Sequence, residues 1–436
     1  AARAPAGASE GGGPAEPGSA EPGASDALAG APEGGGPAEQ GSAELGARDA
    51  PAGALQGSSP AEPGQAFREE AWAAPAGAPR GGGPAERGGA PPGPCPGCVP
   101  VFYPGLNGSR CYRIPTVIRT HEGTLLAFAE NRIDGCEDNG PHHQLVLRRS
   151  SDLGRTWGPL ILVADGRQPC AVCPAAISNP NPVEVLLENG SRAVLLHYDT
   201  LNNPRRAAHG LDMQTWSLDD GRTWHGGEVL SYPPEQNDGS LIGPSVGLQD
   251  ARGVIFFSAN RVDGSGHFLY HSADRGRSWV ASAPIPVSGE CSIAFLVGPL
   301  DGRLLVNCRT GRGQRAQVVM SANGTSAGEV FWPPELVDPG CQGSIVNDDG
   351  VLYFSNANTR HHRANMTVKR SVDQGLTWSP GVLVWDGPSG YSQLVPLGRP
   401  TEIGLLFESK MKGNHTDTVL SFVRVPVEAE QPVVLI

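Results

Sequence analysis

From about Val101 onward, apolar residues occur in short runs rather than at helical spacing. Runs such as TLLAFAE at 124–130, AVLLHYD at 193–199 and GVIFFSA at 253–259 are separated by Gly, Asp, Asn and Pro. Apolar or alternating runs of about four to eight residues between turn residues are typical of β-strands. No segment of comparable strength has the period of an α-helix. The pattern therefore predicts an all-β domain.

The first hundred residues do not show this pattern. The large apolar residues that precede Cys95 are Leu28, Leu45, Leu55, Phe67 and Trp72. Gly, Pro, Ala and Glu dominate the segment, and the hexapeptide GGGPAE occurs at 11–16, 34–39 and 81–86. So few apolar side chains cannot bury enough surface to offset the conformational entropy of the chain. We expect residues 1–99 to form a disordered low-complexity leader and residues 100–436 to form the folded domain.

Charge and hydropathy exclude two classes of protein. The formal net charge is −12, and no basic patch or nucleic-acid-binding motif is visible, so we expect no nucleic-acid partner. No run approaches the 18 or so apolar residues that a membrane-spanning helix needs, so we expect no transmembrane segment.

Cysteines and glycosylation sequons bear on the cellular route. Two CxxC pairs, at 95/98 and 170/173, are too far apart for a zinc ribbon, and the total of nine cysteines leaves at least one unpaired. Five N-glycosylation acceptors occur, at Asn107, Asn189, Asn323, Asn365 and Asn414. They favour a lysosomal, secretory or extracellular location.

One motif recurs four times in the folded domain. Its copies are SSDLGRTW at 150–157, SLDDGRTW at 217–224, SADRGRSW at 272–279 and SVDQGLTW at 371–378. In a hairpin turn, the Asp accepts backbone N–H bonds, the Gly takes a positive φ and the Trp anchors the returning strand. We therefore interpret these Asp boxes as structural and do not take their aspartates as catalytic.

The spacing of the Asp boxes predicts the number of structural units. Successive box aspartates are 67, 55 and 99 residues apart, and 99 is about twice 50, which divides 101–436 into six units of roughly 50–65 residues. Four-stranded sheets repeated around an axis form a propeller, which protects its sheet edges by closing the ring. The prediction is a six-bladed β-propeller whose fourth and sixth blades lack an Asp box.

The segment YRIP at 112–115, followed by the Asp boxes, resembles the exo-α-sialidases, or neuraminidases. The resemblance covers essentially all of 101–436 and none of the leader. PPELVDP, YFSN and DGPSGYSQL look most like the lysosomal sialidase branch, whereas ECSIAF and CQGSI look more like cytosolic and bacterial members. The resemblance implies a glycoside hydrolase that removes terminal α-linked sialic acids from glycoproteins, glycolipids and oligosaccharides.

Arginines are the expected ligands of the substrate. A sialic acid carries an ionised carboxylate on its anomeric carbon, and planar guanidinium groups suit that group better than lysine. The positions that match the three arginines of the family are Arg113 in YRIP, Arg309 in VNCRTGR and Arg363 in RANMT, with Arg360 as a nearby alternative to the last. Arg132 is expected to complete the pocket.

The family resemblance also supplies an acid/base. It follows the FAENR segment at 128–132, which points to Asp138, and Asp134 and Glu137 on the same loop are its competitors.

The remaining catalytic positions come from the same resemblance. Tyr391 in PSGYSQL matches the nucleophile and Glu290 in SGECSIAF matches the base that takes its proton. Glu408 in LLFES matches the carboxylate that orients the first arginine. Asn179 in SNPNPV is a candidate for recognition of the N-acetyl arm.

This mechanism requires neither an organic cofactor nor a metal. Two alternatives remain open: a trans-sialidase with the same residues, and a catalytically silent sialic-acid-binding propeller. Resemblance to the lysosomal branch further implies a carboxypeptidase-type protective partner.

The composition of the leader generates a first prediction. Because residues 1–94 lack core-forming side chains, their removal should leave the melting temperature and the specific activity nearly unchanged. Thermal unfolding of the truncated and full-length chains, measured side by side, tests this. A drop of several degrees on deletion would show instead that the leader packs on the domain.

Overall fold

The computed structural model describes residues 89–138, 140, 142–167, 176–200, 211–230, 240–261, 266–287, 289–410 and 415–427. Most of the predicted leader, together with Cys170, Cys173 and Asn414, lies outside the described residues. The described part of the chain consists of antiparallel strands and two short 3-10 turns, η1 (Leu106–Gly108) and η3 (Gly298–Leu300). The prediction of an all-β domain is therefore confirmed. None of the described residues belongs to a helix with the length and apolarity that a membrane crossing requires.

Two four-stranded sheets come first in the chain. The first sheet, in the order β2-β3-β4-β5, contains β2 (Cys111–Arg119), β3 (Leu125–Arg132), β4 (His143–Ser150) and β5 (Ile161–Asp165). The second, in the order β6-β7-β8-β9, contains β6 (Ile177–Leu186), β7 (Arg192–Thr200), β8 (Asp212–Ser217) and β9 (Glu228–Val229). Each strand pairs with the next one along the chain, which is the simplest antiparallel connection.

Two further sheets follow. In the third sheet the order is β10-β12-β13-β14, and β11 also pairs with β12. Its strands are β10 (Ser240–Ile242), β11 (Leu248–Gln249), β12 (Ile255–Arg261), β13 (His267–Ser272) and β14 (Val280–Ala281). The fourth sheet is β15-β16-β17, formed by β15 (Cys291–Phe295), β16 (Leu304–Cys308) and β17 (Ala316–Met320).

The last sheet has seven strands, in the order β1-β23-β22-β21-β20-β19-β18. Its strands are β1 (Val99–Phe102), β18 (Ser344–Asp348), β19 (Val351–Ala357), β20 (Ala364–Ser371), β21 (Val382–Pro396), β22 (Glu402–Ser409) and β23 (Val419–Pro426). The first of the described strands thus pairs with the last one, so strands from far apart in the sequence meet in one sheet. Strand β1 begins at Val99, one residue before the predicted domain start.

The strand connectivity differs from the predicted six separate units. Strand β21 pairs with β20 between Val382 and Pro388, and with β22 between Ser389 and Pro396. Because one long strand serves two partners at different points along its length, the described strands form five sheets rather than six. A count based on Asp-box spacing cannot detect such a shared strand.

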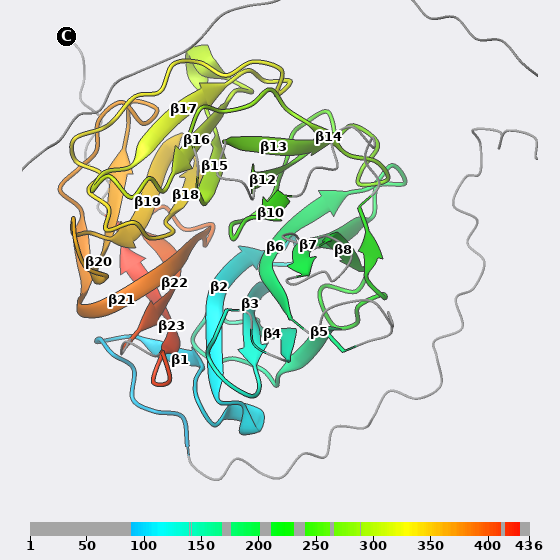
Figure 1. Ribbon diagram of the computed structural model, residues 1–436, viewed down its shortest axis with the longest axis vertical. Helices are drawn as coiled ribbons and strands as arrows, with labels where there is room; N and C mark the ends of the chain where they lie inside the picture. The colour runs from blue at the N-terminus through cyan, green and yellow to red at the C-terminus, as the bar shows by residue number, and fades with distance from the viewer. Residues whose placement is uncertain are drawn as a thin grey trace, which may run out of the picture. The chain divides into compact units, whose positions relative to one another are not determined.

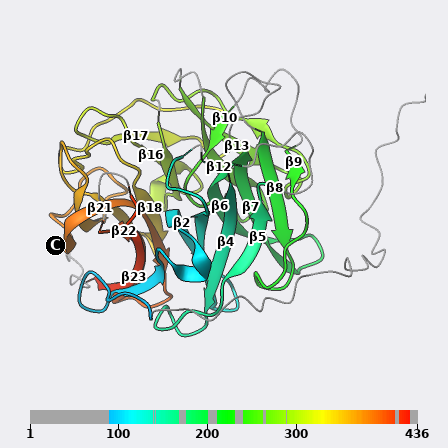
Figure 2. The same ribbon diagram turned by 60° about the horizontal axis from the view of Figure 1, so that its bottom comes forward.

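The sheets are arranged like the blades of a propeller (Figure 1). Neighbouring sheets contact one another around the centre: β2 contacts both β6 and β21, and β15 contacts both β12 and β18. Figure 2 shows the same sheets side by side from a tilted direction. Apolar clusters fill the spaces between neighbouring sheets. One contains Leu126 and Phe128 of β3 with Val194 and Leu196 of β7.

The Asp boxes have the predicted structural role. In the first, Asp152 accepts hydrogen bonds from Thr156 N at 2.9 Å and Thr156 Oγ1 at 2.6 Å, and the other three repeat this pair of contacts. The box glycine Gly154 has a φ of 79°, and a Cβ there would lie 2.1 Å from the Phe422 ring. Trp157 of this box packs edge-on against Phe422. The boxes therefore close hairpins and join neighbouring sheets.

Candidate active site

A fully buried carboxylate holds Arg113 at a bulge in strand β2. Pro115 cannot donate to the sheet ladder, and the pairing with β3 shifts register between Arg113 and Thr116. Ile114 adopts a φ of 58°, and its N–H donates to Glu408 Oε1 at 3.1 Å. Glu408 also accepts from Arg113 Nε at 2.7 Å and from Nη2 at 3.3 Å. The YRIP sequence thus breaks the strand where the arginine must point inward.

Glu408 fixes the backbone of Tyr391 as well. Tyr391 N donates to Glu408 Oε2 at 3.1 Å. Burial alone would raise the pKa of Glu408, but the Arg113 charge and the hydrogen bonds lower it below its ordinary value. Burial opposes ionisation of Arg113 too, yet Glu408 raises the pKa of the guanidinium. The pair therefore stays charged although both side chains are buried.

The phenol of Tyr391 lies against a carboxylate and a guanidinium. Tyr391 Oη donates to Glu290 Oε1, while Arg309 Nη1 donates to Glu290 Oε2 at 2.7 Å and to Tyr391 Oη at 3.4 Å. Glu290 directly precedes β15 and Arg309 directly follows β16, so the pairing of these strands brings the two together. Burial, and then the charge of Glu290, raises the pKa of Tyr391 well above its ordinary value. The phenol is therefore protonated, with its proton facing Glu290.

Two other guanidinium groups flank the Tyr391 ring. Arg113 Cζ lies 5.4 Å and Arg363 Cζ 5.6 Å from the ring centroid. Arg363 precedes β20, and its Nη2 donates to Gly340 O at 3.4 Å. The alternative arginine, Arg360, is exposed and donates to Gly313 O at 3.2 Å. Arg363 is thus the member of this pair that contacts the tyrosine.

Arg132 connects the loop carboxylate to the same cluster. Its Nη1 donates to Asp138 Oδ1 at 2.7 Å and to Cys136 O at 2.6 Å, and Arg113 Nη1 lies 3.7 Å from the same Asp138 oxygen. The Asp138 side chain is 76% exposed, whereas Arg132 is 1% exposed. Burial would raise the pKa of Asp138, but Arg132, followed by Arg113, lowers it. Asp134, one of the two other acid/base candidates on this loop, forms an ion pair with Arg167 at 3.5 Å.

Glu130 is a site residue that sequence reasoning missed. Its Oε2 accepts from Arg132 Nε at 2.8 Å and from Nη2 at 2.6 Å. Its Oε1 accepts from Asn179 N at 2.9 Å and from Ser178 Oγ. Glu130 therefore ties β3 to β6 and fixes Arg132. The signal available in the sequence was its position at the end of the apolar run TLLAFAE, where a carboxylate that becomes buried needs a charged or hydrogen-bonding partner.

Two disulfides bind the strand ends that carry these groups. Cys111–Cys136 joins the start of β2 to the Asp138 loop, and Cys291–Cys308 joins β15 to β16 next to Glu290 and Arg309. A third, Cys95–Cys98, precedes β1. Cys341 is the one free cysteine in the described part of the chain, and it packs with Ile114 and Tyr391.

The site combines four arginines with carboxylates and a protonated phenol. Such a set can bind an anionic group through guanidiniums and can offer a nucleophile with an adjacent base. Within the described ranges, no group of three His, Cys, Asp or Glu side chains is placed to hold a metal ion.

Comparisons with known proteins identify the family of this chain. The sequence profile of the BNR repeat-like domain matches residues 117–401. A sialidase of Bacteroides fragilis is 29% identical over 352 residues, which cover 72% of this chain and 62% of the relative. Human Sialidase-4 is 30% identical over 275 residues, 54% of each protein. The chain belongs to the sialidase family.

The fold is that of known sialidase structures. The Hadza microbial sialidase Hz136 superposes with a TM-score of 0.65 at 24% sequence identity, covering 74% of this chain and 67% of that one. The chain spans about half to three fifths of the length of the two curated sialidases above. At this identity the structural match establishes the sialidase fold alone.

The structure brings all eight sialidase positions expected from sequence into one connected cluster. These are Arg113, Arg132, Asp138, Glu290, Arg309, Arg363, Tyr391 and Glu408. Their catalytic and binding roles stay predictions. Asn179 lies beside the cluster, buried, with its Nδ2 donating to Asp199 Oδ2 at 3.1 Å. A role for it in N-acetyl recognition also stays a prediction.

A buried carboxyl pair supports Asn179. Asp199 on β7 lies directly opposite Asp212 on β8. Besides Asn179, Asp199 accepts from Ile242 N at 3.0 Å, and Asp212 accepts from Tyr270 Oη at 3.0 Å. Burial, and then the charge of Asp212, raises the pKa of Asp199 well above its ordinary value. Two carboxyls in such contact share a proton rather than both ionise.

This pair predicts a pH dependence of stability. The folded-state pKa of Asp199 is raised, so its contribution is present at low pH and is lost as pH rises through that pKa. The free energy of unfolding should therefore fall as pH rises above about 4, the ordinary pKa of an aspartate, with a slope of up to about 1.4 kcal/mol per pH unit from this group.

Denaturant unfolding of wild type and Asp199→Asn across that range is the measurement. The variant removes the titrating group but keeps an amide oxygen for Asn179 or Ile242 N, so its stability should decline less. Buried histidines change the free energy of unfolding with pH in the opposite direction, but their contribution is the same in both proteins. Parallel pH curves for the two proteins would contradict the argument.

Proposed function

We propose that the domain is an exo-α-sialidase that hydrolyses terminal α-linked sialic acids from glycoproteins, glycolipids and oligosaccharides. The observation that carries the proposal is the environment of Tyr391. Its hydroxyl donates to Glu290, and Arg113, Arg309 and Arg363 lie around it. Arginines that bind the carboxylate of a sialic acid would hold the anomeric carbon, which bears that carboxylate, against the phenol.

A phenol suits this anomeric carbon better than a carboxylate nucleophile does. A carboxylate would approach a carbon that already bears a negative group, and the two charges would repel. A neutral phenol avoids the repulsion but needs a base, because its ordinary pKa is about 10. Glu290 is in place for that role, since it already accepts the Tyr391 proton.

In the proposed first step, Tyr391 Oη bonds to the anomeric carbon and its proton passes to Glu290. The bond from that carbon to the leaving-group oxygen breaks, and the oxygen takes a proton from Asp138. In the second step, water attacks the same carbon and gives a proton to Asp138, while Tyr391 leaves and recovers its proton from Glu290. Two displacements at one carbon retain its configuration.

The position of Asp138 suggests how it becomes an acid. Arg132 and Arg113 stabilise its ionised form in the free protein. A substrate carboxylate bound to these arginines would offset their positive charge, so the pKa of Asp138 would rise. Substrate binding would thereby protonate the group that must donate to the leaving oxygen.

We also propose that residues 100–436 form a single six-bladed propeller. The pairing of β21 supports this count, because its first half completes a sheet with β18–β20 and its second half begins one with β22, β23 and β1. Divided there, the seven-stranded sheet gives two four-stranded blades.

A trans-sialidase is the nearest alternative, and a silent sialic-acid-binding protein is the other. One assay of a fluorogenic sialoside, with and without lactose as acceptor, separates the three. If the same amount of free sialic acid is released with and without lactose, the result supports the hydrolase. Sialyllactose formation would favour the transferase, and binding without turnover would favour the silent protein.

The cellular setting belongs to the same proposal. The sequons at Asn107, Asn189, Asn323 and Asn365, together with the disulfides, support a lysosomal or secretory location. The carboxypeptidase-type protective partner rests on resemblance to the lysosomal branch and stays a prediction.

The acid role of Asp138 can be tested by varying the leaving group. Asp138→Asn should lower the rate by about 10²–10⁴-fold for a poor leaving group, and much less for an activated aryl sialoside that needs little protonation. Asp134→Asn and Glu137→Gln are matched loop controls and should have little effect. If Asp134→Asn produced the large, leaving-group-dependent loss, the acid would be assigned to the wrong residue.

The Tyr391–Glu290 pair should behave as one unit. Tyr391→Phe leaves Glu290 nothing to activate, and Glu290→Gln leaves the phenol without a base, so the double variant should be little slower than either single one. A fluorosialyl trapping reagent followed by mass spectrometry should label wild type on Tyr391. Label on a carboxylate, or near-normal turnover by Tyr391→Phe, would be incompatible with this mechanism.

A further inference from the structure

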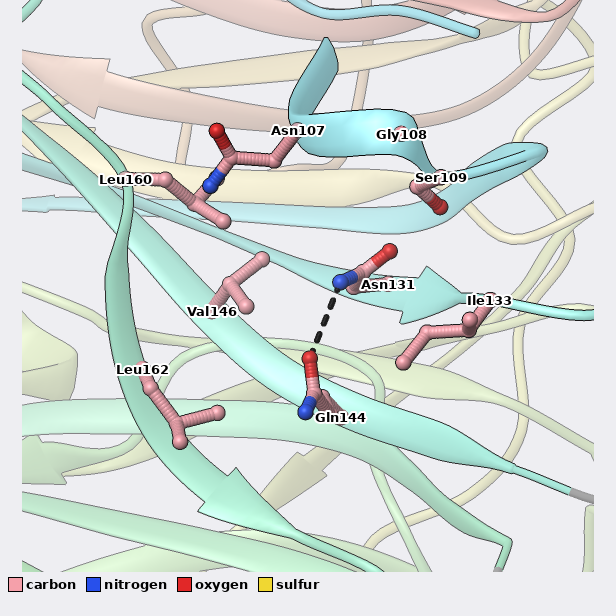
Figure 3. Close-up of a pocket in the computed structure, with 9 residues that line it drawn as sticks. All are labelled: Asn107, Gly108, Ser109, Asn131, Ile133, Gln144, Val146, Leu160 and Leu162. Carbon is pink, nitrogen blue, oxygen red and sulfur yellow. Dashed lines mark hydrogen bonds between the residues drawn. The ribbon is translucent and has the colours of Figure 1, made fainter. Parts of the chain in front are cut away.

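A pocket of about 240 Å³ lies between the η1 turn and strands β3 to β5, apart from the candidate active site. Figure 3 shows Asn107 and Ser109 on one side of it, with Leu160 next to Asn107, Asn131 near the end of β3, and Val146 and Leu162 on the other side. A volume of this size is space for a single sugar residue rather than for a large cofactor. No residue of the proposed active site lines this pocket.

The pocket contains a buried polar atom that lacks a partner. Asn131 is 5% exposed, and its Nδ2 donates to Gln144 Oε1 at 3.0 Å. Among the described residues, its Oδ1 has no hydrogen-bond donor. Figure 3 shows this oxygen on the side of the amide that faces away from Gln144. A buried amide oxygen without a donor is costly, so the site calls for a ligand with an N–H or O–H group.

Part of the lining is apolar, and one of these apolar side chains is half-exposed. Val146 is buried in β4, whereas Leu162 on β5 is 51% exposed. Leu160 also lines the pocket. An occupant with one polar edge and one apolar face would satisfy Asn131 and also cover these side chains.

Asn107 is itself a sequon asparagine, in Asn107-Gly108-Ser109. It is exposed at the pocket edge with a φ of 49°. The asparagines of two other sequons differ: Asn189 Oδ1 accepts from Ser191 Oγ and Asn323 Oδ1 from Thr325 Oγ1, each at 2.7 Å in an exposed turn. Of the three, Asn107 alone lines this pocket.

We propose that Asn107 carries an N-linked glycan whose first N-acetylglucosamine lies in this pocket. An acetamido N–H or a hydroxyl of the sugar donates to Asn131 Oδ1, and its apolar face covers Leu160 and Leu162. The site is therefore a modification site with its own binding pocket for the attached sugar.

The attachment step uses a polyprenyl-pyrophosphate-linked oligosaccharide as donor. Asn107 Nδ2 bonds to C1 of the sugar, the bond from C1 to the pyrophosphate oxygen breaks, and the amide proton leaves with the lipid pyrophosphate. Ser109 is 3% exposed in the folded domain, and its Oγ donates to Arg132 O at 3.4 Å. Transfer must therefore precede folding, and the sugar enters the pocket as the domain forms.

The pocket adjoins the backbone of an active-site strand. Asn131 and Ile133 flank Arg132 in sequence, and both line the pocket. A sugar there would stabilise the end of β3 on the side opposite the buried Arg132 side chain. Loss of the sugar should consequently reduce the stability of the domain more than loss of a glycan from an exposed turn.

The experiment uses the full chain, secreted from a glycosylating eukaryotic cell. Glycopeptide mass spectrometry should find Asn107 occupied. Under native conditions, peptide-N-glycosidase should release the Asn107 glycan at least about tenfold more slowly than the Asn189 glycan, because release requires local opening of the pocket. After denaturation the two rates should converge. An unmodified Asn107, or native release as fast as at Asn189, would overturn the proposal.

Two variants separate pocket binding from simple attachment. Asn107→Gln should lower the melting temperature by several degrees, whereas the matched control Asn189→Gln should not. Leu162→Glu keeps the sequon and alters a half-exposed side chain, so the chain should fold with Asn107 occupied but with its glycan released quickly in the native state. Slow native release that Leu162→Glu leaves unchanged would refute the pocket as the place of the sugar.

Discussion

The Glu408 carboxylate is the contact on which the central cluster depends. It binds the Arg113 side chain and two backbone N–H groups, those of Ile114 and Tyr391. These groups come from β2 and β21, at the position where the first sheet meets the last. Removing one partner of such a buried pair costs about 3–5 kcal/mol, because the remaining charge has no water to solvate it. The same carboxylate thus contributes to ring closure and to the position of the tyrosine.

Glu130 repeats this arrangement one strand away. It holds Arg132 through two hydrogen bonds and accepts a third hydrogen bond from the backbone N–H of Asn179 on β6. The two buried glutamates thus fix two arginines and connect β2 and β3 to their neighbours on either side. Arg309 and Arg363 are less buried and have fewer fixed partners. The charge that remains for an anionic ligand is therefore concentrated beside Tyr391.

Sequence reasoning succeeded where a residue acts through its own local conformation. The Asp boxes could be predicted because Asp152 binds Thr156 within one turn and Gly154 needs only a positive φ. The short strands could be predicted from their apolar runs for the same reason.

It failed where partners lie far apart in sequence. Nothing in the FAENR segment shows that Glu130 meets Asn179, 49 residues later. The Asp199–Asp212 pair depends on the register of β7 and β8. The sharing of strand β21 depends on the point at which its pairing with β20 ends and its pairing with β22 begins. The eight site positions came from family resemblance, since the spacing of an arginine or a tyrosine does not indicate which neighbour it contacts.

The disulfides explain how irregular strand ends can hold an accurate site. Bulges interrupt the ladders beside Arg113 and Tyr391, and each bulge removes hydrogen bonds that would otherwise fix the backbone. A half-cystine lies close to the first of these bulges, and the other half-cystines lie close to further residues of the site. Cys111 lies two residues before Arg113, Cys136 two before Asp138, and Cys291 and Cys308 are adjacent to Glu290 and Arg309. A crosslink restricts the chain without needing a regular ladder, so it can fix a strand end that the site forces out of register. The covalent links and the buried ion pairs therefore act on the same segments: the ion pairs aim the side chains, and the disulfides limit how far the backbone that carries them can move.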